Sequence, residues 1–167
     1  MITPAYVQTM AAYNAEMNRR LYAAAARLSD EERRMERGAF FGSIHATLNH
    51  LLWGDRMWMS RFDGWDKPAV PLAGNWNLIE AFEALRSART EADAALLGWA
   101  SGVRQDWLDG RMTWFSGAVG QEMSRPVATL VAQLFSHQTH HRGQVHAMLT
   151  AAGQQTGDTD LCLVVQE

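Results

Sequence analysis

The apolar residues of this 167-residue chain recur every three or four positions over most of its length, a spacing that predicts amphipathic helices. The first helix is expected to start at Thr3-Pro4, where a threonine cap precedes a proline in the first turn, and to run to about Leu28. Ser29 and Glu32 then have the spacing of a capping box, which predicts a short helical segment with the sequence DEERRME.

A second long helix, SIHATLNHLLWGDRMWMSRF, is expected to start at Gly42-Ser43 and to end near Asp63-Gly64. The segment that follows, GWDKPAVPLAGNW, contains two prolines and two glycines and predicts a loop. Asn77 and Glu80 have the spacing to cap a third helix, which we expect over roughly residues 77–100.

Residues 101–125 have the weakest helical pattern, and MTWFS followed by Gly117 and Gly120 predicts a short hairpin. Pro126 suits the first turn of a fourth long helix, which we expect to continue to Ala152 and to stop at Gly153. The tail begins as a loop and then becomes apolar, which predicts a strand-like end that packs on the body of the protein or on a second subunit.

Four long helices predict an all-α protein, a four-helix bundle with a hairpin or irregular insertion before the last helix, and residues 1–167 as one domain. The net charge is −3 and the basic residues are dispersed, so we expect no nucleic-acid partner. No apolar stretch reaches the length of about 18 residues that spans a membrane, and MITPAYVQTM lacks the pattern of a signal peptide. We therefore expect a cytoplasmic protein without a membrane partner, in which the single cysteine, Cys162, is a small buried residue.

Candidate chemistry is concentrated in FSHQTHHRGQVHAML, residues 135–149, which contains four histidines. His137 and His141 lie one turn apart on one face of the expected helix, whereas His140 and His146 point elsewhere. An i, i+4 pair presents two imidazoles to one metal ion. The alternative is a pair of hydrogen-bonded core histidines, and the spacing alone does not decide between them.

A catalytic metal site usually has three protein ligands, so a third is needed from another helix. His50 is better placed than His45, because it lies among leucines and is followed one turn later by Gly54, which leaves room beside it. The expected site is therefore His50, His137 and His141. Di-iron Glu-x-x-His pairs, the HExxH motif, phosphate-binding loops and the GxSxG elbow are all missing from the sequence.

Other polar residues have weaker claims to the site. Gln144 follows His141 by one turn and is a candidate for lining a pocket, as is Asn14; for Asn14 and Asn18, hydrogen bonds between helices are the simpler interpretation. Asp55 and Arg142 are expected to pair with each other beside the ligands. Trp53, Trp58 and Trp114 are candidates for the wall of a pocket, although tryptophans at such spacings are more often core residues.

Three segments in this order resemble the DinB/YfiT-like family: YNAEMNRRLY at residues 13–22, GSIHATLNHLLWGDRMW at residues 42–58 and HQTHHRGQVHAML at residues 137–149. The resemblance implies a mirror variant of the up-and-down four-helix bundle, commonly dimeric. It also implies zinc or nickel bound by three histidines, at the positions of His50, His137 and His141. Family members of known activity are transferases and isomerases that use a low-molecular-weight thiol, such as bacillithiol, mycothiol or a glutathione-like compound.

From the residues and the resemblance together, we expect a divalent-metal-dependent enzyme on small molecules, a homodimer of the thiol-dependent S-transferase, hydrolase or isomerase type. The nucleophile would be a thiol or water activated by the metal. A non-catalytic metal-binding module of the stress response is the alternative, since no carboxylate shares the predicted ligand face and no catalytic residue stands out. A purely structural bundle without metal is a third interpretation.

Overall fold

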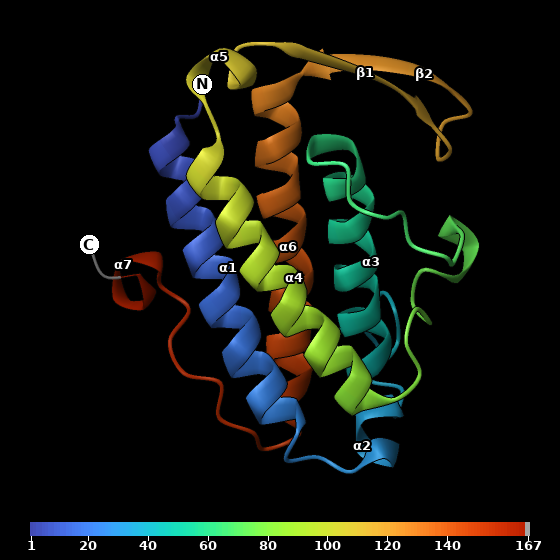
Figure 1. Ribbon diagram of the computed structural model, residues 1–167. Coiled ribbons are helices and arrows are strands. Elements are labelled where there is room, and N and C mark those ends of the chain that lie inside the picture. Colours follow the sequence, from blue (N-terminus) through green and yellow to red (C-terminus); the bar gives the residue numbers. More distant parts are fainter. Residues whose placement is uncertain (166–167) are drawn as a thin grey trace.

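The computed structural model describes residues 1–165, and most of them are helical (Figure 1). The four long helices are α1 (Pro4–Ala25), α3 (Ile44–Phe62), α4 (Phe82–Gly102) and α6 (Val127–Ala151). The shorter elements are α2 (Asp30–Arg34), a 3-10 turn (Leu72–Gly74), α5 (Gln105–Leu108), β1 (Arg111–Ser116), β2 (Gln121–Pro126) and α7 (Leu161–Val164). The protein is therefore mostly helical with one small two-stranded sheet.

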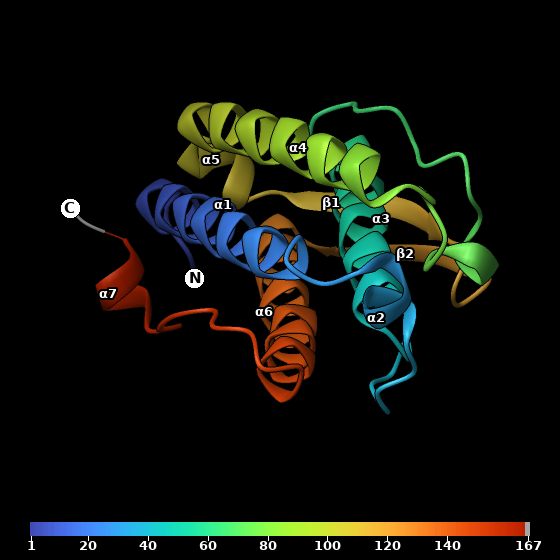
Figure 2. The ribbon, with the colours of Figure 1, turned by 90° about the horizontal axis from the view of Figure 1, so that it is seen from below.

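The four long helices pack around a shared interior. Both α1 and α3 contact α4 and α6, so that α1 and α3 lie on opposite sides of the group (Figures 1 and 2). The helices α3 and α4 run toward the end of the molecule that carries the hairpin, whereas α1 and α6 start at that end (Figure 1). No helix in residues 1–165 is long and apolar enough to cross a membrane.

Local capping explains where the first helices begin. The Thr3 hydroxyl accepts a hydrogen bond from the Tyr6 backbone N–H, with Pro4 in the first turn, as the sequence predicts. Ser29 and Glu32 form both bonds of a capping box, and Ser43 caps α3. The regular part of α1 ends at Ala25, slightly before the predicted Leu28, and the chain continues in tight turns to that residue.

The predicted start of the third long helix is wrong. Helix α4 begins at Phe82 with Ala81 as its N-cap, and no side chain bonds this end of the helix. The reason is tertiary: the Ile79 backbone N–H donates to Asn49 Oδ1 at 2.7 Å, and the Ile79 carbonyl bonds with His45 Nε2 at 3.2 Å. Helix α3 thereby holds the preceding segment in a non-helical conformation.

The predicted hairpin is present. Strands β1 and β2 pair in antiparallel fashion, with Trp114 opposite Met123, and Gly120 has a positive φ of 71° in the turn that also contains Gly117. The predicted strand-like tail is instead the short helix α7, since the hairpin is the only sheet within residues 1–165 and the tail does not pair with it. Cys162 in α7 is exposed rather than buried; the last two positions, 166–167, lie outside the described residues.

A polar layer crosses the middle of the apolar interior. One apolar cluster includes Leu21, Leu52 and Leu149, and another, nearer the hairpin, includes Val7 and Val131. Between them, all four long helices contribute buried polar or charged side chains: Asn14, Asn18, Asp55, Arg89, Asp93, Gln138 and Arg142. His137 and His141 are next in sequence to two members of this layer on α6, and His50 precedes Asp55 by five positions on α3.

Candidate metal centre

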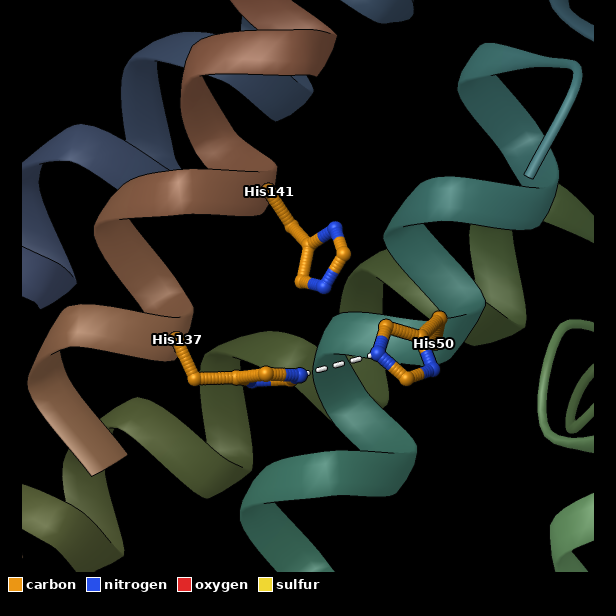
Figure 3. Close-up of side chains that lie close together, drawn as sticks. All are labelled: His50, His137 and His141. Atoms are coloured by element: carbon orange, nitrogen blue, oxygen red, sulfur yellow. Dashed lines mark hydrogen bonds between the residues drawn. The ribbon is translucent and has the colours of Figure 1, made fainter. Parts of the chain in front are cut away.

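Helices α3 and α6 bring His50, His137 and His141 together. Each histidine offers one ring nitrogen, and these three atoms lie within 4.8 Å of one another. His137 and His141 extend from consecutive turns of α6 toward His50 on α3 (Figure 3). The Nε2 atoms of His50 and His137 are 2.9 Å apart, so one ring donates a hydrogen bond to the other. The three residues chosen from helical periodicity therefore converge.

The environment of the cluster favours neutral imidazoles. His50 and His141 are only 7% and 8% exposed. Burial, with the proximity of His137 and His141, lowers the pKa of His50 from 6.5 to about 3. Burial and the neighbouring His141 lower the pKa of His137 to about 4. Burial also lowers the pKa of His141. At neutral pH the rings thus carry lone pairs rather than extra protons, which is the state in which histidine binds a metal.

Gln144 fixes the orientation of one imidazole. Its side-chain oxygen lies 2.8 Å from His141 Nδ1, so the histidine donates through Nδ1 and keeps its lone pair on Nε2. Histidine ligands commonly have such a hydrogen-bond acceptor behind them. Gln144 therefore supports the cluster through His141, while its predicted contact with a bound small molecule stays a prediction.

The donor set fits a divalent cation of borderline softness. Three neutral nitrogen donors suit zinc, nickel and related ions, whereas magnesium and calcium prefer oxygen. The Nδ1 atoms of His50 and His137 are buried and have no hydrogen-bond partner within residues 1–165. Both rings are therefore held mainly by packing, and we infer that these residues fit a metal ion with open coordination positions.

Gly54 makes room for one of the three rings. A Cβ atom on Gly54 would lie 2.9 Å from His137 Cε1, closer than real Cβ atoms approach another atom. The sequence predicts free space beside His50 at this position; the structure shows that His137 fills it. Phe41 covers the other side of His50, with the ring centroids 4.0 Å apart and the planes 28° apart.

A cavity of about 570 Å³ opens next to the cluster. His50 and His137 lie in its wall, so a small molecule in the cavity would reach both rings. Trp53, Trp58 and Trp114 also line it, as the sequence suggests. The volume lies within the usual range for sites that bind small molecules, roughly 300–1,000 Å³.

The remaining histidines lie outside the cluster. His45 bonds with the Ile79 carbonyl, and His146 Nδ1 bonds with the Thr156 hydroxyl at 2.8 Å. His140 lies beside Gln144, 3.4 Å from its amide nitrogen. These three histidines have the structural or peripheral places that the helical geometry predicts.

The predicted pairing of Asp55 with Arg142 is wrong. Asp55 Oδ2 is 2.6 Å from Arg89 Nη1, and Arg89 Nη2 is 2.8 Å from Asp93 Oδ1. Arg142 instead donates to Gln138 Oε1 at 3.1 Å. Asp55 thus faces α4. The prediction failed because α3 contacts both α4 and α6, and the angular position of a residue on α3 does not say which of these helices it meets.

The two asparagines of α1 belong to this polar layer rather than to the histidine cluster. Asn18 Nδ2 donates to Asp93 Oδ1 at 2.9 Å, which is a hydrogen bond between helices, as predicted. Asn14 is buried, and its amide has no partner within residues 1–165. Its proposed contact with a ligand stays a prediction.

Sequence reasoning missed two residues of the site, Arg61 and Phe41. Arg61 follows His50 by eleven positions, which at about 100° per residue returns it to nearly the same face of α3. Helical periodicity could therefore have identified Arg61 as a residue of the cavity wall. Phe41 precedes α3 in a loop, and no periodic pattern could have placed its ring on His50.

Comparison with known proteins identifies a family for nearly the whole chain. The model of the DinB family matches residues 1–166. The match includes every element from α1 to α7 and all three histidines of the cluster. No curated protein matches the chain.

Proposed function

The chain belongs to the DinB family, and on that basis we propose that it is a metal-dependent enzyme in which His50, His137 and His141 hold a divalent cation, zinc or nickel. The observation that carries the proposal is the convergence of three neutral imidazoles, two of them buried and one partly buried, beside a cavity of about 570 Å³ whose wall includes His50 and His137. A structural role alone does not call for three histidines whose pKa values are all lowered by burial and whose ring nitrogens face one another.

The side chains around the cluster have separate tasks in this proposal. Burial keeps the imidazoles unprotonated, and Gln144 directs the Nε2 lone pair of His141 toward the other two rings. Gly54 lets His137 approach α3, and Phe41 packs on His50. The tryptophan-lined cavity positions a small molecule beside the cluster.

We propose a thiol-dependent S-transferase or isomerase type of reaction on a small molecule. The chemistry that a bound cation supplies is a lowered pKa for a thiol or water, which becomes a usable nucleophile near neutral pH. No acidic side chain lines the cavity among the described residues, and this fits a nucleophile that arrives with a low-molecular-weight thiol cosubstrate.

The wider organisation belongs to the same proposal. We infer one domain over residues 1–167, with the mirror variant of the up-and-down four-helix bundle, acting as a cytoplasmic homodimer without nucleic-acid or membrane partners. The contacts among the four long helices support a bundle, whereas their directions depart from simple alternation, because α3 and α4 are consecutive along the chain and run the same way. Light scattering of the purified protein tests the dimer, and a monomeric mass would contradict it.

The first experiment measures metal content and metal affinity. Wild-type protein and the variants His141→Ala and His140→Ala are purified identically, analysed by mass spectrometry for metals, and titrated with zinc and nickel by calorimetry. His140 is the matched control, because it is adjacent in sequence but outside the cluster. We expect stoichiometric metal in wild type and His140→Ala and its loss in His141→Ala. Equal metal in all three proteins would refute the ligand assignment.

The second experiment separates an enzyme from a non-catalytic metal-binding module. The metal-loaded protein is assayed with low-molecular-weight thiols against epoxides, alkyl halides and other small electrophiles. We expect turnover that requires both thiol and metal and that His141→Ala abolishes. Bound metal without turnover across this panel would favour the non-catalytic module instead.

A further inference from the structure

The cavity beside the histidine cluster carries positive charge that no carboxylate in its wall neutralises, as far as residues 1–165 show. Arg61 and Lys67 lie in its wall, and no Asp or Glu does within the described part of the chain. The protein as a whole has a net charge of −3, so this local excess is not a general property of the surface. A cavity with two cations and no anion favours an anionic ligand.

Arg61 is the better placed of the two cations. It lies on α3, half-buried, and its guanidinium carbon is 4.8 Å from the ring centroid of Trp58 and 6.0 Å from that of Trp114. Across residues 1–165, no carboxylate lies within ion-pair distance of it. Burial lowers the pKa of Arg61, with no carboxylate to offset the effect.

In this position the guanidinium of Arg61 is oriented to bind a planar anion. A guanidinium stacked on an aromatic face keeps N–H donors at its edge, where they match the two oxygens of a carboxylate. Arg89 shows the contrast, because this fully enclosed arginine forms ion pairs with two aspartates. A partly buried arginine without such a partner has donors available for a ligand.

The rest of the wall is aromatic and comes from distant parts of the chain. Trp58 on α3 and Trp114 on β1 meet with ring centroids 5.9 Å apart, and Trp53, whose ring centroid is 6.4 Å from that of His50, also lies in the wall. Met57, one turn before Arg61, adds an adaptable apolar surface. Aromatic walls of this kind favour a flat apolar body, which stacks on them when it leaves water.

We propose that this cavity binds a small molecule with a flat apolar body and a carboxylate, with Arg61 binding the carboxylate and the tryptophans binding the body. The molecule is the substrate that meets the thiol or water at the histidine cluster. This inference rests on the proposed function for the role of the molecule as a substrate, but its binding is measurable without metal. Lys67, exposed at the cavity, attracts the same anion.

The probe pair is naphthalene-1-acetate and its neutral analogue naphthalene-1-acetamide. Binding to wild-type protein is measured by calorimetry and by quenching of tryptophan fluorescence, on the protein as purified and after removal of metal with a chelator. A charge-assisted, bidentate contact is expected to make the carboxylate bind at least about tenfold more tightly than the amide. Because the preference is expected in both preparations, a direct bond from the carboxylate to a metal is not needed to explain it.

Variants assign the preference to Arg61. In Arg61→Gln the tenfold preference should disappear, and in Arg61→Lys it should return in part. Arg56→Gln is the matched control: it removes one positive charge from the same helix, at a residue that lines a neighbouring cavity, which shares only Lys67 with this one. Trp114→Leu should weaken both probes about equally. Circular dichroism and thermal unfolding establish that each variant is folded.

Any of three results with the two naphthalene probes would overturn the inference. They are equal binding of the two probes to wild type, a preference that survives Arg61→Gln, and loss of the preference in Arg56→Gln as well. Glutathione, which carries carboxylates without an aromatic body, is a third probe; Arg61-dependent binding of glutathione but not of naphthalene-1-acetate would show that the anion belongs to the thiol and would refute the substrate class. Failure to bind metal, by contrast, would refute the proposed function and leave the carboxylate preference standing.

Discussion

Replacing Gly54 by alanine should damage the histidine cluster while leaving the fold intact. An ideal Cβ at this position lies 2.9 Å from Cε1 of His137, 3.4 Å from Nδ1 and 3.8 Å from Nε2. Favourable carbon–carbon contacts begin at about 3.5 Å, so the ring must withdraw by roughly 0.6 Å. Metal–ligand distances tolerate only about 0.2 Å, so a shift of this size takes the Nε2 donor out of range.

Gly54→Ala should have opposite effects on two quantities, the stability of the metal-free protein and its affinity for zinc. Alanine in the interior of a helix is favoured over glycine by about 0.5–1 kcal/mol. The clash falls on the end of the His137 side chain, which can swing aside without moving backbone, so we expect metal-free Gly54→Ala to be at least as stable as wild type. The affinity for zinc should fall at least tenfold, which corresponds to about 1.4 kcal/mol.

The assay combines zinc titration by calorimetry with thermal unfolding in the presence of a chelator. Gly143→Ala is the matched control, because it lies on the same helix as His137 and a Cβ there meets nothing within 4 Å. It should gain the same helix stability, seen as a rise in Tm of a few degrees at this chain length, roughly 2–4 °C per kcal/mol, with unchanged zinc affinity. Wild-type affinity in Gly54→Ala would refute the packing argument, as would a loss of more than about 2 kcal/mol in metal-free stability.

Three further results are expected. Asp55→Ala removes one of the two carboxylates that pair with the buried Arg89 and should lower the free energy of unfolding in urea by about 3 kcal/mol, the low end of the range for breaking a buried pair because Asp93 remains; a loss below about 1 kcal/mol would mean that the pair is not enclosed as described. Gln144→Leu removes the acceptor behind one ligand and should weaken zinc binding about ten- to hundredfold with little change in Tm, so unchanged affinity would argue against its orienting role. Since the pKa values of His50 and His137 are held to about 3 and about 4, the unfolded chain binds more protons below about pH 6.5, and metal-free stability should fall toward pH 4 by up to about 1.4 kcal/mol per pH unit for each histidine; a flat profile in urea unfolding would contradict this.

Local sequence was sufficient to predict most of the helices and their starting residues. The caps at Thr3, Ser29 and Ser43 act on backbone groups within three positions, so their effect does not depend on the rest of the fold. The same reasoning predicted the wrong start for α4, because Asn49 on another helix accepts a hydrogen bond from the backbone N–H of Ile79. A capping pattern competes with any partner that the tertiary structure brings to the same N–H groups.

The C-terminal tail and the partner of Asp55 were also predicted wrongly, because each depends on the tertiary structure. An apolar run such as LCLVV forms a strand only when it pairs with another strand, and within residues 1–165 the sheet consists of β1 and β2 alone and the tail does not pair with either. Asp55 has a well-defined direction on α3, but its partner was identified wrongly, since α4 and α6 both lie within reach of that helix. Periodicity gives the direction of a side chain and leaves its neighbour undetermined.

The sequence by itself determined the pair His137 and His141, because two residues four positions apart on one helix face the same way whatever surrounds them. Only the tertiary structure decided what completes the site. The packing of α3 against α6 puts His137 in the space that Gly54 leaves, with its Nε2 atom 2.9 Å from that of His50. The hairpin brings Trp114 to Arg61 from a distant part of the chain. These contacts depend on how separate elements dock, and docking is set by the fit of whole surfaces, which no short-range spacing in the chain records.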